Sequence, residues 1–82
     1  MAERKPISLN VWQSKARTPK GKAEHAEVIG HARAIEEYIN ARLGDEPQVF
    51  LYDNIARDLG IARDTVREIL MYNRGSENSI RW

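Results

Sequence analysis

The chain contains no cysteine among its 82 residues. Disulfide bonds, thiolate catalysis and zinc sites with sulfur ligands are therefore excluded together. Long apolar runs are also missing, because the longest ones, Val49 to Tyr52 and Ile69 to Tyr72, are far shorter than a membrane span or a signal-peptide core. We expect a cytoplasmic protein that does not enter a membrane.

Residue patterns that support catalysis or metal binding are also missing. No serine or threonine lies in a nucleophile motif, no glycine loop follows a strand, and no pair of carboxylates is isolated in apolar surroundings. His25 and His31 are six residues apart, which is the wrong spacing for two metal ligands on one helix face. We therefore expect no enzymatic activity, no cofactor and no metal site.

The charge is small overall but unevenly distributed. The net charge is +1, and 41% of the residues are hydrophobic, as in an ordinary globular protein. Residues 1–22 carry six cations against one acid, residues 23–49 carry six acids against two arginines, and the remaining third is neutral. This distribution indicates one surface turned toward a polyanion and another turned away from it.

The chain divides into an N-terminal arm and one small domain. Residues 1–22 form the basic arm, in which the alternation of apolar and polar residues from Ile7 to Trp12 predicts a short strand and the polar stretch Gln13–Lys22 predicts a linker. Its cations could follow DNA phosphates. The alternative is a flexible, solubilising terminus. The cations placed in this role are Lys15, Arg17, Lys20 and Lys22.

Residues 23–82 form the domain, which begins with its longest helix. Apolar residues recur every three or four positions from Ala23 to Leu43, and Gly44 and Pro47 follow, so we expect one amphipathic helix there. Short strands are predicted at 48–51 and 79–82. Asp53 is expected to cap the next helix.

The stretch Tyr52–Met71, YDNIARDLGIARDTVREILM, organises the rest of the chain. Its apolar residues follow helical spacing that is interrupted once, at Leu59-Gly60-Ile61, which predicts two helices joined by a tight turn. A small residue, Ala56, lies four positions before the glycine and lets the two helices approach closely. Gly60 can adopt a positive φ at low cost.

These residues resemble the helix-turn-helix of DNA-binding regulators. The matching features are Ala56, Gly60, Val66 and the apolar residues between them, and the segment LGIARDTVREIL is most similar to that of GntR-type winged-helix repressors. Ala62 departs from that pattern, because a serine or threonine usually caps the second helix there. The resemblance implies a mainly α fold: a three-helix winged helix-turn-helix with two or three short β-strands forming a minimal wing.

The last helix, about residues 62–73, would then be the recognition helix. At 100° per residue, Arg63, Arg67 and Arg74 share a narrow outward strip. Arginine suits bidentate contact with guanine and with phosphate. The flanking residues Asp64 and Glu68 could accept hydrogen bonds from cytosine amino groups or orient Arg67. The alternative is a solvated helix face with local ion pairs. The predicted DNA-binding residues of this helix and its end are Arg63, Asp64, Thr65, Arg67, Glu68 and Arg74.

We expect a sequence-specific regulator of transcription that binds double-stranded DNA in the nucleoid as a homodimer. Two alternatives use the same fold. One is a protein–protein interaction module of transcription or mobile-element machinery, which the near-neutral charge and the acidic long helix favour. The other is a nucleoid protein that binds DNA without sequence preference.

Overall fold

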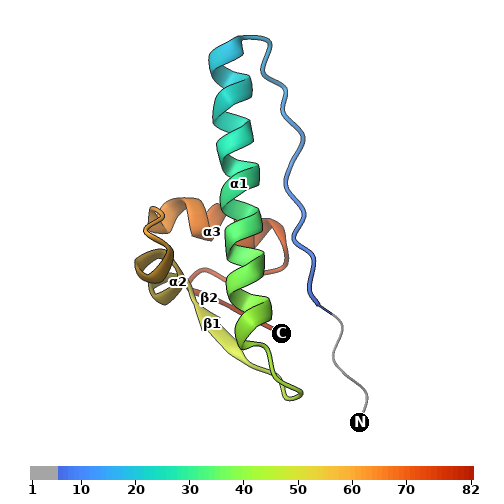
Figure 1. The fold of residues 1–82 in the computed structure, drawn as a ribbon, viewed down its shortest axis with the longest axis vertical. Helices are drawn as coiled ribbons and strands as arrows, with labels where there is room; N and C mark the ends of the chain where they lie inside the picture. The colour runs from blue at the N-terminus through green and yellow to red at the C-terminus, as the bar shows by residue number, and fades with distance from the viewer. Residues whose placement is uncertain (1–5) are drawn as a thin grey trace.

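The computed structural model describes residues 6–82. Residues 1–5, which include Arg4 and Lys5 of the predicted basic arm, lie outside the described part. Within residues 6–82 three helices and a two-stranded antiparallel sheet form the mainly α, winged helix-turn-helix layout that the sequence predicts (Figure 1). The elements are α1 (Pro19–Arg42), β1 (Val49–Leu51), α2 (Tyr52–Leu59), α3 (Arg63–Tyr72) and β2 (Ser79–Arg81).

The long helix α1 begins at Pro19 and not at the predicted Ala23. Thr18 caps it, because its side-chain oxygen accepts a hydrogen bond from the Gly21 amide at 3.2 Å. The predicted linker Gln13–Lys22 therefore contains a helix start, with Thr18 as the cap and Pro19 at the first helical position, to which a proline is well suited. Lys20 and Lys22 consequently belong to the first turn of a helix and not to an arm.

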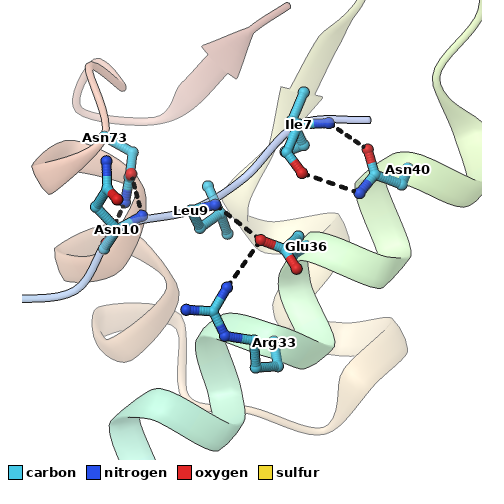
Figure 2. Close-up of polar contacts among 7 residues, drawn as sticks. All are labelled: Ile7, Leu9, Asn10, Arg33, Glu36, Asn40 and Asn73. Atoms are coloured by element: carbon cyan, nitrogen blue, oxygen red, sulfur yellow. Dashed lines mark hydrogen bonds and ion pairs between the residues drawn. The ribbon is translucent and has the colours of Figure 1, made fainter. Parts of the chain in front are cut away.

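The N-terminal segment, residues 6–17, forms no strand, and the predicted strand at 7–12 is wrong. The segment runs antiparallel to α1 in extended form (Figure 1). Its backbone is bound by side chains instead of a neighbouring strand. Figure 2 shows Asn40 bonded to both the N–H and the C=O of Ile7, and Asn73 bonded in the same way to Asn10.

Glu36 and the buried Leu9 complete this attachment. The Glu36 carboxylate accepts hydrogen bonds from the Leu9 amide at 2.8 Å and from the Arg33 guanidinium at 2.9 Å. Leu9 itself is 1% exposed. Polar side chains thus satisfy backbone groups that a sheet would otherwise pair. The segment is part of the folded domain from Ile7 to at least Trp12, whose carbonyl contacts His25 Nε2 at 2.6 Å.

The two strands pair over three residues each. Phe50 lies opposite Ile80 and both face inward, whereas Val49 and Leu51 of the same strand are 60% and 48% exposed. Gln48 and Trp82 extend the pairing by exchanging both backbone hydrogen bonds. The sheet is therefore short, and only one of its faces packs against the core.

Helix α2 begins at Tyr52, and Asp53 does not cap it as predicted. The chain passes directly from β1 into the helix, so Asp53 lies in the first turn and its carboxylate is free to bind another element. Tyr52 is fully buried and its hydroxyl donates to the Ser76 carbonyl at 2.5 Å. Burial raises the pKa of this hydroxyl, which keeps it protonated as a donor.

Gly60 forms the corner between α2 and α3 as the sequence predicts. Its φ is +67°, and its N–H bonds to the Ala56 carbonyl, which ends α2 in a left-handed cap. Helix α3 then packs against both α2 and α1. The resulting core joins all elements and consists of Leu9, Ala32, Ile35, Ile39, Phe50, Tyr52, Ile55, Ala56, Val66, Ile69, Leu70 and Ile80.

A polar contact at the surface also joins α1 to α2. Tyr38 Oη donates to Asp58 Oδ2 at 2.6 Å, and this hydrogen bond lowers the pKa of the Asp58 carboxyl. A carboxyl whose pKa is lower in the folded state stabilises the fold above its unfolded pKa, and this contribution is lost as the pH falls through the folded value.

We therefore expect Tyr38→Phe to raise the pKa of Asp58 toward its ordinary value. An NMR titration of the Asp58 carboxyl carbon measures the change directly. Tyr72→Phe is the matched control, because it removes a hydroxyl that has no contact with Asp58. An Asp58 titration that is identical in wild-type protein and Tyr38→Phe would contradict the assigned cause.

Candidate nucleic-acid interface

Helix α3 is held at the surface by the corner that precedes it. Val66, Ile69 and Leu70 on its inner side are fully buried. Its N-terminal end follows Ala62, whose methyl group cannot cap the helix, so the first amides of α3 point outward without a side-chain acceptor from that position. A helix end of this kind favours an anion such as phosphate.

Arg63, at the start of α3, is bound on two sides by its own protein. Its Nε donates to the Asp53 carboxylate, and its Nη2 donates to Asn78 Oδ1 at 2.7 Å. These contacts connect α3 to the first turn of α2 and to the turn before β2. They orient the guanidinium while leaving several of its five N–H groups available. The arginine side chain is 38% exposed.

Arg67, one turn further, is held more loosely. Its Nη2 lies 3.8 Å from Glu77 Oε1, which is at the limit of an ion pair, and the Glu77 side chain is 80% exposed. An exposed pair at this distance contributes little to stability. A phosphate or a guanine edge can therefore replace Glu77 without a large cost to the fold.

Arg74 does not share the helical strip with the other two arginines. Helix α3 ends at Tyr72, and Arg74 lies in the following turn with φ +73°. The prediction that Arg63, Arg67 and Arg74 form one strip of α3 is therefore wrong for Arg74. The projection assumed an unbroken helix, whereas Asn73 ends it and its side chain bonds to the Ile69 carbonyl.

The outermost line of α3 is acidic and apolar. The residues opposite its buried side are Asp64, Glu68 and Met71, and all three are exposed. Thr65 is half-buried beside them. The two arginines thus flank this line on the side of the wing, which comprises β2 and the turn before it, and do not occupy the centre.

The four cations predicted in the N-terminal arm lie in, or in the segment before, the N-terminal half of α1. Lys15 and Arg17 are exposed in the N-terminal segment, and Lys20 and Lys22 are exposed at the start of α1. This end of α1 projects beyond the rest of the fold (Figure 1). Ala32 is the first residue of α1 that belongs to the buried core, and Lys20 lies about 18 Å before it along the helix axis. The structure therefore separates two basic surfaces.

Sequence reasoning missed the partners of the arginines and a hollow beside α3. Asp53, Glu77 and Asn78 carry no local signal of their proximity to α3, because each belongs to another element. Trp12 packs edge-on against Tyr72 with ring centroids 5.7 Å apart. Trp12 and four residues of α3 line a shallow hollow of about 680 Å³, and the four are Arg67, Glu68, Met71 and Tyr72.

Two further findings concern the described part of the chain. No helix within residues 6–82 is both long and apolar enough to cross a membrane. No group of three or more histidine, aspartate or glutamate side chains in the same range is arranged to hold a metal ion.

In comparisons with known proteins, no family model, curated protein or solved structure matches this chain.

Proposed function

We propose that this chain binds double-stranded DNA as a sequence-specific regulator of transcription, with α3 in the major groove. The observation that carries the proposal is the placement of Arg67: it lies on an outward helix of a helix-turn-helix, and its one ion pair within residues 6–82 is weak and exposed. Arg63 adds an oriented guanidinium one turn earlier. The two side chains are spaced to reach neighbouring phosphates or base edges.

The arm and the first turn of α1 supply the second part of the proposed interface. Lys15, Arg17, Lys20 and Lys22 are exposed and can neutralise backbone phosphates, which contributes affinity without sequence preference. Because they lie before the part of α1 that belongs to the buried core, they would contact a different stretch of the duplex. One module of this kind buries about 600 to 1,000 Å² on DNA. We therefore propose a homodimer on a two-fold symmetric site as the working form.

Arg67→Ala is expected to weaken binding to duplex DNA about tenfold at low salt. The removal of one phosphate contact also lowers the slope of log affinity against log salt by about 0.9, whereas the removal of a guanine contact relaxes specificity at one base pair. Fluorescence anisotropy with a labelled duplex between about 50 and 200 mM salt measures both quantities.

Arg42→Ala is the matched control for this measurement. Arg42 lies at the end of α1, with its guanidinium 3.6 Å from the centroid of the Tyr38 ring and remote from α3. The Arg42→Ala substitution removes the same charge as Arg67→Ala but lies outside the proposed interface. If both variants lose the same affinity for the duplex, net charge and not α3 determines the affinity.

A second candidate function is a protein–protein interaction module. The observation that favours it is the outermost line of α3, Asp64, Glu68 and Met71, which suits a mixed polar and apolar protein surface better than a phosphate backbone. A folded wild-type protein that binds no duplex at any salt concentration would favour this function.

Selection of bound sequences from a random duplex pool separates the remaining alternatives. A regulator enriches a defined site, and two half-sites at fixed spacing would report the dimer. A nucleoid protein binds the same pool without enrichment.

A further inference from the structure

Two hydrogen-bond acceptors of Arg63 are anchored to one buried residue. Tyr52 is fully buried, and Asp53 follows it directly in the first turn of α2. The Tyr52 amide donates to the Asn78 carbonyl at 3.1 Å, and the Tyr52 hydroxyl donates to the Ser76 carbonyl in the same turn before β2. Asp53 and Asn78 therefore belong to one frame, although they come from different elements.

This frame holds one edge of the Arg63 guanidinium. The Nε donates to Asp53 Oδ1, and the Nη2 donates to Asn78 Oδ1. Nε and Nη2 are the two nitrogens of the side edge of a guanidinium, so the protein itself occupies that edge. Both N–H groups of Nη1 and one of Nη2 form no bond to another residue in the range 6–82. They remain available to a ligand.

Arg67 is held in a different way. Its ion pair with Glu77 is 3.8 Å long, and no second acceptor in the described part of the chain fixes the plane of its guanidinium. A mobile cation can follow a phosphate, whereas bidentate recognition of a guanine requires the arginine plane in one orientation. The two arginines of α3 are therefore suited to different contacts.

The charge of Asp53 is unfavourable at a surface that binds DNA. Its side chain is 73% exposed, and a carboxylate there repels phosphates. Its ion pair with Arg63 is also exposed, and such a pair contributes little to stability. The orientation of Arg63 is the effect that offsets this repulsion.

We infer that Asp53 and Asn78 are positioning residues that determine base specificity through Arg63. The inference rests on the proposed function and deepens it. Arg63 reads a guanine with its plane set by α2 and the wing, while Arg67 supplies affinity from the phosphate backbone. Guanine presents two acceptors, O6 and N7, to one arginine. Neither Asp53 nor Asn78 touches the DNA in this role.

The substitutions Asp53→Ala and Asp53→Asn test this role as a pair. Both remove the same charge, but only asparagine keeps an oxygen acceptor for Arg63 Nε. The probe is the duplex that the wild-type protein enriches from a random pool, compared with copies in which each G·C pair is replaced in turn by A·T. The ratio of the two affinities, measured by fluorescence anisotropy, is the discrimination at that base pair.

In the wild type, one G·C pair should show about tenfold discrimination, which Arg63→Ala abolishes. Asp53→Ala should lose most of the discrimination at the same pair, whereas Asp53→Asn should retain most of it. The double variant should lose no more than Arg63→Ala alone, because the two residues act as one unit. The affinity for a random-sequence duplex should rise about twofold in both Asp53 variants, since each loses a charge that repels phosphate.

Asn78→Ala tests the second acceptor without any change of charge. It keeps the backbone bond to the Tyr52 amide, and the Asn78 side chain bonds only to Arg63 among residues 6–82. Discrimination at the guanine pair should therefore fall, while the affinity for a random-sequence duplex stays at the wild-type level.

Glu77→Ala is the matched control. It removes an exposed acid beside Arg67, so it should raise the affinity for random duplex as the Asp53 variants do. Discrimination at the guanine pair should remain that of the wild type. Thermal unfolding followed by circular dichroism shows whether each variant is folded.

Three results would overturn the inference and leave the proposed function intact. One is wild-type discrimination in Asp53→Ala or Asn78→Ala at the pair that Arg63→Ala loses. Another is an equal loss in Asp53→Ala and Asp53→Asn, because charge and not orientation would then be responsible. The third is an Asp53→Ala variant that does not fold together with an Asn78→Ala variant that discriminates normally. If the wild type enriches no sequence or binds no duplex, the proposed function fails and this inference fails with it.

Discussion

Gly75→Ala is expected to lower the free energy of unfolding by about 3 kcal/mol. A Cβ on Gly75 would lie 2.6 Å from the Leu70 carbonyl oxygen and would collide with the Tyr52 hydroxyl. Neither group can move easily, because the carbonyl ends α3 and the tyrosine is fully buried and bonded to Ser76. A domain of this size loses roughly 12 to 24 °C in melting temperature for such a change.

Gly30→Ala is the matched control. Gly30 lies in the middle of α1, and a Cβ there meets nothing within 4 Å. Because alanine is the better helix former, this variant should gain about 0.5 to 1 kcal/mol. Urea unfolding of both variants measures the contrast. Similar midpoints for Gly75→Ala and wild type would mean that the turn after α3 can shift, and that its tight packing against Tyr52 is not required.

Leu9→Ala is expected to destabilise the protein by about 3 kcal/mol, because large-to-small changes at buried leucines typically cost 2 to 5 kcal/mol. The size of this effect matters because Leu9 belongs to a segment without regular secondary structure. Its side chain is 1% exposed and belongs to the same core cluster as Ile35 and Ile39. A domain of this length has a total stability of roughly 4 to 12 kcal/mol, so the loss is a large part of it.

Ser8→Ala controls for the position in the chain, since Ser8 is the exposed neighbour of Leu9. Its unfolding midpoint should lie within about 0.5 kcal/mol of the wild type. Limited proteolysis adds a local measurement, because loosening of the segment in Leu9→Ala would expose the chain near Trp12 to cleavage. If Leu9→Ala and Ser8→Ala unfold alike, the N-terminal segment contributes nothing to the core.

The helix-turn-helix corner was predictable because its signals are local. Gly60 needs a positive φ, Ala56 must be small, and both requirements are visible within a few residues of each other. The burial of Val66 and Ile69 follows from the same helical spacing. Elements whose geometry is determined by neighbours in the chain can be read from a single sequence.

The N-terminal segment was not predictable in the same way. Alternation from Ile7 to Trp12 correctly marks Leu9 as an inward residue, but it cannot show what binds the backbone. Asn40 and Asn73 do so in place of a strand, and they are 33 and 63 residues away from Ile7 and Asn10. No property of those asparagines in the sequence distinguishes them from surface residues.

The candidate site was predicted in part. Helical spacing placed Arg67 on the outside of α3, where it lies. The same spacing could not reveal that Asp53 and Asn78 would bind Arg63, because this depends on how α2 and the wing pack around α3. Arg74 was misplaced because the end of the helix is set by Asn73 and its tertiary contact with Asn10.

The attachment of the N-terminal segment also has a consequence for biosynthesis. Asn10 leaves the ribosome early, whereas Asn73, to which it is bonded, follows 63 residues later. Contacts between distant positions form late, because a long loop must close first. The contact of Asn10 with Asn73 therefore forms after the contacts of Ile7 with Asn40 and of Leu9 with Glu36, whose partners are 33 and 27 residues away, so the segment docks on α1 before it docks on the end of α3.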